Sequence, residues 1–180
     1  LAYKHKKQYD QAIADYTKAI AFDPNNLMAY INRGETLSDK GQFDQAIEDF
    51  NKAIGINSEY YNVYILRGNT YIKKGQYDQA IADYNQAVAF NPQLFVAYNN
   101  RGNVYISKGQ YDRAIADFSQ AIAINPQFAA AYYNKGSAYE KIGKTQDAVD
   151  AYRRFLTFSS SQDNTEYIKH AMEYISKFGR

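Results

Sequence analysis

The sequence contains no cysteine, and histidine and proline are scarce, with two and three residues respectively. Without cysteine the chain has no disulfide framework, no thiolate zinc site and no cysteine nucleophile. The two imidazoles, His5 and His170, lie at opposite ends of the sequence and do not form a pair of metal ligands. Few prolines and no tryptophan, beside 19 tyrosines, indicate a helical protein with one repeated packing position.

Neither sign of charge dominates, because 21 Lys and Arg stand against 19 Asp and Glu, for a net charge of +2. Domains that bind the phosphate backbone are usually strongly basic, so we expect no nucleic acid partner. No uninterrupted apolar run approaches the roughly 18 residues that span a bilayer, so we expect no membrane insertion. Hydrophobic residues still make up 46% of the chain, which is enough for a folded core.

The most informative feature is an internal repeat with a period of 34 residues. GQFDQAI at Gly41 returns as GQYDQAI at Gly75 and as GQYDRAI at Gly109, and weaker copies start at Lys7 and Gly143. Such a period is typical of arrays of stacked supersecondary units. Three further columns share the period: glycine at Gly34, Gly68, Gly102 and Gly136, alanine at Ala12, Ala46, Ala80, Ala114 and Ala148, and an aromatic residue at Tyr16, Phe50, Tyr84, Phe118 and Tyr152.

Each repeat is predicted to form two helices. In residues 95–128, a first apolar stripe at spacings of four and three ends at Gly109, where a helix C-terminus favours a left-handed residue. A second stripe ends at Asn125-Pro126, because the residue before proline disfavours the helical region. Neither helix could bury its face in a lone hairpin, so neighbouring hairpins must stack to form the core.

These columns resemble the tetratricopeptide repeat, a 34-residue helix–turn–helix unit with characteristic aromatic, Gly, Tyr, Ala, Phe and Pro positions. Counted from residue 27, position 4 is tyrosine, position 8 glycine, position 20 alanine and position 24 aromatic in all four full repeats. The resemblance implies an all-α fold, a right-handed superhelical solenoid of antiparallel helix hairpins. A further apolar stripe after the fourth repeat predicts a C-terminal capping helix, with Asp163, Asn164 or Thr165 as its N-cap. We therefore expect a single domain over residues 1–180, with a partial repeat at 1–26, full repeats at 27–60, 61–94, 95–128 and 129–162, and the capping helix at 163–178.

The chain departs from the family pattern at position 7, which is usually leucine and is here Arg33, Arg67 and Arg101 in the first three full repeats. The fourth repeat has Lys135 at this position and Ala151 at position 23. Because positions 7 and 23 change together, we expect them to touch as an Arg–Asp pair between the two helices. The aspartates of these pairs are Asp49, Asp83 and Asp117 at position 23. The alternative is that the arginines form a ladder that binds acidic ligands.

The sequence contains no recognisable catalytic constellation. It has no GxSxG, no HExxH and no glycine-rich phosphate loop. Asp44, Asp78 and Asp112 recur at the starts of the predicted second helices, where a negative charge stabilises the helix dipole. We expect no enzymatic activity, no cofactor and no metal site.

The resemblance places the ligand surface on the concave side of the superhelix, lined by first-helix positions 2, 5, 6, 9, 12 and 13. Asparagine recurs there although it is a poor helix former. Its amide both donates and accepts hydrogen bonds, which suits the peptide groups of an extended chain, and the arrangement resembles asparagine ladders that hold peptide backbones in the family. The alternative is that these asparagines are solvated or bond one helix to another. The predicted peptide-binding groove, called the amide surface below, comprises Asn32, Ile65, Asn69, Val96, Asn99, Asn100, Asn103, Tyr133 and Asn134.

Chaperone-binding members of the family use a carboxylate clamp that combines asparagines with lysine or arginine. The asparagines of that clamp are present here, but Ile65 and Ala130 stand at positions where the clamp needs cations. A chaperone C-terminal tail is therefore not expected as the ligand.

The sequence predicts a non-enzymatic protein-interaction module, a scaffold or adaptor that holds a peptide or partner segment. Two alternatives are a self-assembling structural scaffold and the regulatory arm of a larger enzyme. Residue 1 corresponds to position 9 of a repeat, so the apolar face of residues 9–20 lacks part of its partner helix. We expect residues 1–22 either to pack against another copy of the chain, as a homo-oligomer, or to fray.

Overall fold

The computed structural model describes residues 2–160 and 165–179, and within these residues it contains ten α-helices and no strand. The all-α prediction is confirmed. The chain divides into two compact units, Leu1–Pro92 and Gln93–Arg180, each with its own helix hairpins. The extent of a single domain over residues 1–180 stays a prediction.

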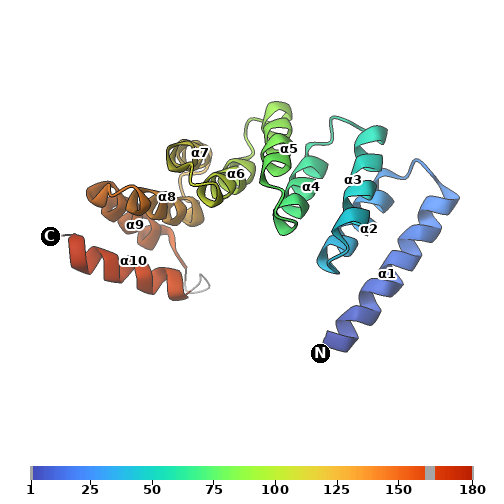
Figure 1. The fold of residues 1–180 in the computed structure, drawn as a ribbon, viewed down its shortest axis with the longest axis horizontal. Coiled ribbons are helices and arrows are strands. Elements are labelled where there is room, and N and C mark those ends of the chain that lie inside the picture. The colour runs from blue at the N-terminus through green and yellow to red at the C-terminus, as the bar shows by residue number, and fades with distance from the viewer. Residues whose placement is uncertain (1, 161–164, 180) are drawn as a thin grey trace. The chain divides into compact units, whose positions relative to one another are not determined.

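The first unit contains two helix hairpins preceded by one long helix (Figure 1). Each helix packs against the next along the chain, and α2 also contacts α4, so first helices of successive repeats are neighbours. The predicted helix-pair repeat is therefore present. The helices are α1 (Ala2–Phe22), α2 (Leu27–Asp39), α3 (Phe43–Ile56), α4 (Tyr61–Lys73) and α5 (Tyr77–Phe90).

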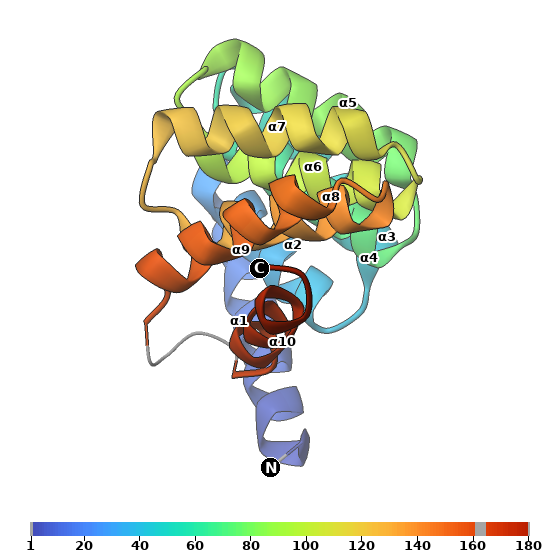
Figure 2. The same ribbon diagram turned by 90° about the vertical axis from the view of Figure 1, so that its left-hand side faces the viewer.

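The second unit contains two further hairpins and a terminal helix, α10 (Thr165–Phe178), which packs against α9. Figure 2 looks nearly along the axis of α10 while α9 runs across the view, so these two helices cross steeply. The predicted terminal helix is present, and the N-cap candidates Asp163 and Asn164 lie outside the described residues. The other helices are α6 (Phe95–Ser107), α7 (Tyr111–Ile124), α8 (Ala129–Lys141) and α9 (Thr145–Phe158).

Left-handed glycines separate the two helices of each full repeat. Gly41, Gly75, Gly109 and Gly143 have φ between 69° and 84°, which glycine adopts without steric cost. The equivalent position before the first of these is Lys7, and α1 runs through it as one helix of 21 residues. The first helix therefore continues without a break where each full repeat has a turn, because the glycine that would end it is absent.

The core of each hairpin is built from the alanine and aromatic columns. The aromatic side chain at position 24 is completely buried in each full repeat and packs on the position-8 glycine of its own hairpin. At Gly102 an added Cβ would lie 2.6 Å from Phe118 Cε1, so only glycine permits this approach. Burying one such ring stabilises the fold by about 1.5–3 kcal/mol. An isolated hairpin would leave its outer apolar faces in water, so neighbouring hairpins must stack to bury them.

Candidate functional site

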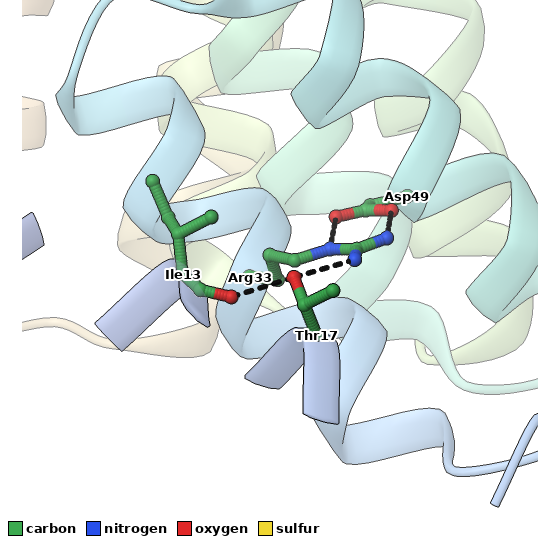
Figure 3. Close-up of polar contacts among 4 residues, drawn as sticks. All are labelled: Ile13, Thr17, Arg33 and Asp49. Atoms are coloured by element: carbon green, nitrogen blue, oxygen red, sulfur yellow. Dashed lines mark hydrogen bonds and ion pairs between the residues drawn. The ribbon is translucent and has the colours of Figure 1, made fainter. Parts of the chain in front are cut away.

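Three Arg–Asp pairs join the first and second helices of their repeats, as the concerted change of positions 7 and 23 predicts. Arg33 on α2 donates from Nε and Nη2 to Asp49 Oδ2 and Oδ1 on α3, both at 2.7 Å (Figure 3). The Asp49 side chain is only 6% exposed. The same two-bond geometry occurs at Arg67–Asp83 and Arg101–Asp117, with N···O distances of 2.6–2.9 Å.

The arginines of the first unit also reach the preceding repeat. Arg33 Nη1 donates to Thr17 Oγ1 on α1 at 3.0 Å, and Thr17 in turn donates to the carbonyl of Ile13 (Figure 3). Arg67 Nη1 makes the equivalent bond to Asn51 Oδ1 on α3. The hydrogen bonds to Asp49 raise the pKa of Arg33 and outweigh the opposing effect of burial. The guanidinium groups are thus used inside the protein, which favours the structural pair over a ladder for acidic ligands.

In the first unit, the amide surface is represented by half-buried Asn32, Ile65 and Asn69. Asn69 Oδ1 accepts a hydrogen bond from Tyr84 Oη at 2.6 Å, so this amide links α4 to α5. Asn69 also lines a pocket of about 270 Å³ between α2 and α4, together with Glu35. Burial, with a smaller effect of the nearby Asp39, raises the pKa of Glu35.

In the second unit, part of the amide surface is used in packing. Asn99 is buried, and its Oδ1 accepts a hydrogen bond from Asn134 Nδ2 at 3.0 Å, which links α6 to α8. Tyr133 is covered by α10, because its ring stacks on Tyr167 with 4.4 Å between centroids. The helix-to-helix alternative therefore holds for the Asn99–Asn134 bond.

Two other members of the amide surface in this unit are open to solvent. The side chain of Asn103 is exposed, and Val96 is 41% exposed. Asn100 is half-buried and has hydrogen-bonding or electrostatic contacts of its own. The structure thus joins Asn134 of α8 to Asn99 of α6, and α6 also carries the exposed Val96 and Asn103.

One polar cluster, of which only Tyr133 belongs to the predicted site, lies where α8, α9 and α10 meet. Tyr152 Oη donates to Glu140 Oε2 at 2.8 Å, and His170 Nε2 lies 3.5 Å from the same oxygen. The hydroxyl of Tyr133 is 3.4 Å from His170 Nδ1. Burial, followed by the bond to Glu140, raises the pKa of Tyr152, so the phenol stays protonated as a donor. Its contacting pairs are 12 to 37 residues apart, and no local sequence signal joins them.

The described residues add no metal-binding constellation. No group of three or more His, Asp or Glu side chains there is arranged to hold a metal ion. None of the described helices combines the length and hydropathy that crossing a membrane requires.

Sequence-family models described as TPR repeat match residues 1–41, 68–107 and 102–143, and models described as tetratricopeptide repeat match residues 28–60 and 129–162. The chain belongs to the tetratricopeptide repeat family. Its fold is accordingly that of a solenoid protein-interaction module, a class that is typically non-catalytic. A search of curated protein sequences finds no significant match.

Solved structures of tetratricopeptide repeat proteins superpose on the chain over most of its length. MamA is 30% identical with a TM-score of 0.79, and the match covers 95% of each chain. The first tetratricopeptide repeat domain of Spaghetti (RPAP3), bound to the HSP90 peptide SRMEEVD, is 27% identical with a TM-score of 0.60, covering 67% of this chain and 96% of that one. YrrB, described as having an unusual peptide-binding site, is 23% identical with a TM-score of 0.75, covering 93% and 84%. At 23% identity, the likeness to YrrB concerns the fold alone.

Proposed function

We propose that the chain holds an extended segment of a partner protein along the first helices of its repeats, and so serves as a scaffold or adaptor. The observation that carries this proposal is the group on α6 and α8 of the second unit: Asn134, oriented by its bond to Asn99, beside the exposed Asn103 and Val96. It is a surface of amides and aliphatic groups with little charge.

An oriented amide is well suited to a peptide backbone. Asn134 uses one N–H of its amide to bond Asn99, and its second N–H and its carbonyl oxygen retain hydrogen-bonding capacity. Because the bond to Asn99 already fixes the Asn134 rotamer, ligand binding loses less side-chain entropy than it would at a freely rotating residue. Asn103 adds an exposed amide of the same chemistry on α6. Peptide N–H and C=O groups could therefore bond to the surface in either direction.

The side-chain preference of the ligand follows from the groups beside these amides. Val96 presents an exposed aliphatic side chain, and Ile65 contributes a half-buried one to the first unit. The clamp cations of chaperone-binding relatives are replaced at Ile65 and Ala130. We therefore expect a neutral segment with small apolar side chains, unlike the acidic peptide SRMEEVD seen with RPAP3.

The test uses peptides selected on the wild-type chain from a displayed library, with affinities measured by fluorescence anisotropy. Replacing Asn100, Asn103 and Asn134 together by Ala should weaken binding at least tenfold and leave the helical circular dichroism spectrum unchanged. Asn103→Ala alone, at an exposed position, should weaken it several-fold without any effect on stability. Full affinity in both variants would refute the proposal.

The matched control removes carboxamides elsewhere in the second unit. Gln120 on α7 and Gln127 before α8 are exposed and lie outside the first helices. Gln120→Ala and Gln127→Ala should bind the selected peptides within twofold of the wild type.

A second candidate function is self-assembly, and the exposed apolar residues of α1 favour it. Phe22 is 94% exposed, and the alanine and aromatic columns are less buried in α1 than in α3 or α5. Light scattering across a concentration series separates the two functions, since an assembling scaffold keeps growing beyond a dimer as concentration rises and a peptide receptor does not.

A further inference from the structure

The fourth repeat lacks the internal carboxylate that its three predecessors share. Arg33, Arg67 and Arg101 each bind an aspartate of the following helix through two hydrogen bonds. At the same place in the fourth repeat, α8 carries Lys135 and α9 carries the buried Ala151. The fourth repeat therefore has a cation at position 7 but no carboxylate at position 23.

A pocket of about 200 Å³ lies where the aspartate would be. Lys135 and Tyr139 of α8 line one side, and Ala151 and Arg154 of α9 line the other. The Lys135 ammonium lies 5.7 Å from the centroid of the Tyr139 ring. Lys135 is half-buried and forms no salt bridge in the part of the chain that the structure describes.

Two aspartates also line this pocket, but neither replaces the missing partner. Asp150 accepts a hydrogen bond from Gln146 at 3.1 Å and lies 3.6 Å from Arg153. Asp147 is exposed in the first turn of α9, where the helix dipole stabilises its charge. Burial lowers the pKa of Lys135, and Asp147 raises it by less. The ammonium is therefore incompletely compensated in its present surroundings.

The cations around the pocket outnumber the free anions. Arg154 is exposed and forms no ion pair among the described residues, and the Lys144 ammonium lies 6.0 Å from the Tyr139 centroid. Lys135 and Lys144 thus place two positive charges beside the Tyr139 ring, and Arg154 adds a third at the pocket wall. The pocket's two aspartates are Asp147 and Asp150, and Asp150 already lies 3.6 Å from Arg153.

We propose that this pocket is a carboxylate-binding site that accepts an acidic side chain or a C-terminal carboxylate of a partner protein. The bound carboxylate occupies the place of the position-23 aspartate and accepts hydrogen bonds from Lys135. This site is distinct from the amide surface, because Lys135 follows Asn134 by one residue and so lies about 100° around α8. It gives the interaction module a second, charge-selective contact.

The test measures binding of fluorescein-labelled peptides to the full chain at low salt. One peptide carries three glutamates and an amidated C-terminus, a second carries three glutamines instead, and a third has no acidic side chain but a free C-terminal carboxylate. We expect the wild type to bind the first or the third at least tenfold more tightly than the second. Preference for the first identifies a side chain as the ligand, and preference for the third identifies a C-terminus. Equal binding of all three would overturn the proposal.

Two variants test the pocket from opposite directions. Lys135→Met removes the cation, and Ala151→Asp supplies an internal carboxylate. Each variant should therefore abolish the at least tenfold preference for the carboxylate-bearing peptide over the glutamine peptide. Ala151→Asp should also raise the thermal midpoint of unfolding, because it restores the pair of the other repeats. Retained preference in either folded variant would contradict the proposal.

Lys141→Met is the matched control, since Lys141 is an exposed lysine on the same helix and lies outside the pocket. This variant should keep the preference within twofold. If it weakens binding as much as Lys135→Met, general surface charge is responsible and the proposed site is wrong. Asn103→Ala should leave binding of the acidic peptide intact, which separates this proposal from the function proposed for the amide surface.

Discussion

The guanidinium of Arg67 occupies a place where the family pattern puts an apolar leucine, and Asp83 makes that substitution tolerable. The Arg67 side chain is 18% exposed and the Asp83 side chain 5% exposed. A pair this far from water has little net worth over a hydrophobic pair, yet losing one partner leaves an uncompensated charge. The effect of a substitution on the free energy of unfolding therefore depends on which partner of the pair is removed.

We expect Asp83→Ala to lower the free energy of unfolding by about 2–4 kcal/mol. This value lies between roughly 3–5 kcal/mol for breaking a fully buried pair and 0–1 kcal/mol for an exposed one. Urea denaturation followed by circular dichroism measures it. Arg67→Leu in the same chain should recover most of the loss, because leucine needs no charged partner, and a double variant as unstable as Asp83→Ala would show that the two positions are independent.

Asp44→Ala provides the comparison for an exposed aspartate of the first unit. Asp44 lies in the first turn of α3, its side chain is 78% exposed, and it is 2.5 Å from Lys74 Nζ. Its loss should cost no more than about 1 kcal/mol.

At the scale of elements, α10 completes the second unit by covering the last hairpin. Ala171 is completely buried and packs in one cluster with Ala148, Tyr152 and Phe155 of α9. Arg153 Nη2 adds a 2.8 Å hydrogen bond to the carbonyl of Gly179 at the end of the helix. The helix thus takes the place that the next repeat would occupy in a longer array.

Ala171→Asp should detach α10 from α9 and destabilise the chain by about 3 kcal/mol, since it places an unpaired carboxylate in an apolar cluster. Hydrogen exchange should show faster exchange in both α9 and α10. The neighbouring Met172 is 58% exposed, so Met172→Asp should change stability by no more than about 0.5 kcal/mol. Equal effects at the two positions would mean that α10 is not docked through Ala171.

At the scale of the whole molecule, the half-buried apolar face of α1 is the surface through which we expect the chain to associate with itself. Tyr16 stands at the position of Phe50 and Tyr84, which are completely buried, yet it is only half-buried. Apolar positions of this kind usually find a partner when they form a continuous patch. The homo-oligomer expected through residues 1–22 remains a prediction.

We predict that the chain forms a dimer through α1 and that Tyr16→Glu returns it to a monomer, because the new charge would be buried in the contact. Light scattering across a concentration series gives the molar mass. Lys18→Glu changes a side chain on α1 that is 78% exposed, and it should leave the dimer intact. A mass that is unaffected by Tyr16→Glu would exclude this face as the contact.

The sequence by itself determined the repeat architecture, since the signals for it are local. Helix ends are set by residues such as Gly109 and Pro126, whose backbone preferences act within a few residues. The concerted change at Lys135 and Ala151 likewise revealed the contact between positions 7 and 23. Even the continuous α1 had a local signal, because Lys7 stands where every full repeat has glycine.

Only the tertiary structure decided which asparagines of the amide surface are used internally and which face solvent. Asn99 and Asn103 are one turn apart on α6, yet the first is buried against Asn134, 35 residues away, and the second is exposed. The same holds for Glu140, Tyr152 and His170, which meet through the packing of α8, α9 and α10. An amide or a carboxylate has the same local propensity in either setting, and its role depends on which group a neighbouring helix brings within hydrogen-bonding distance.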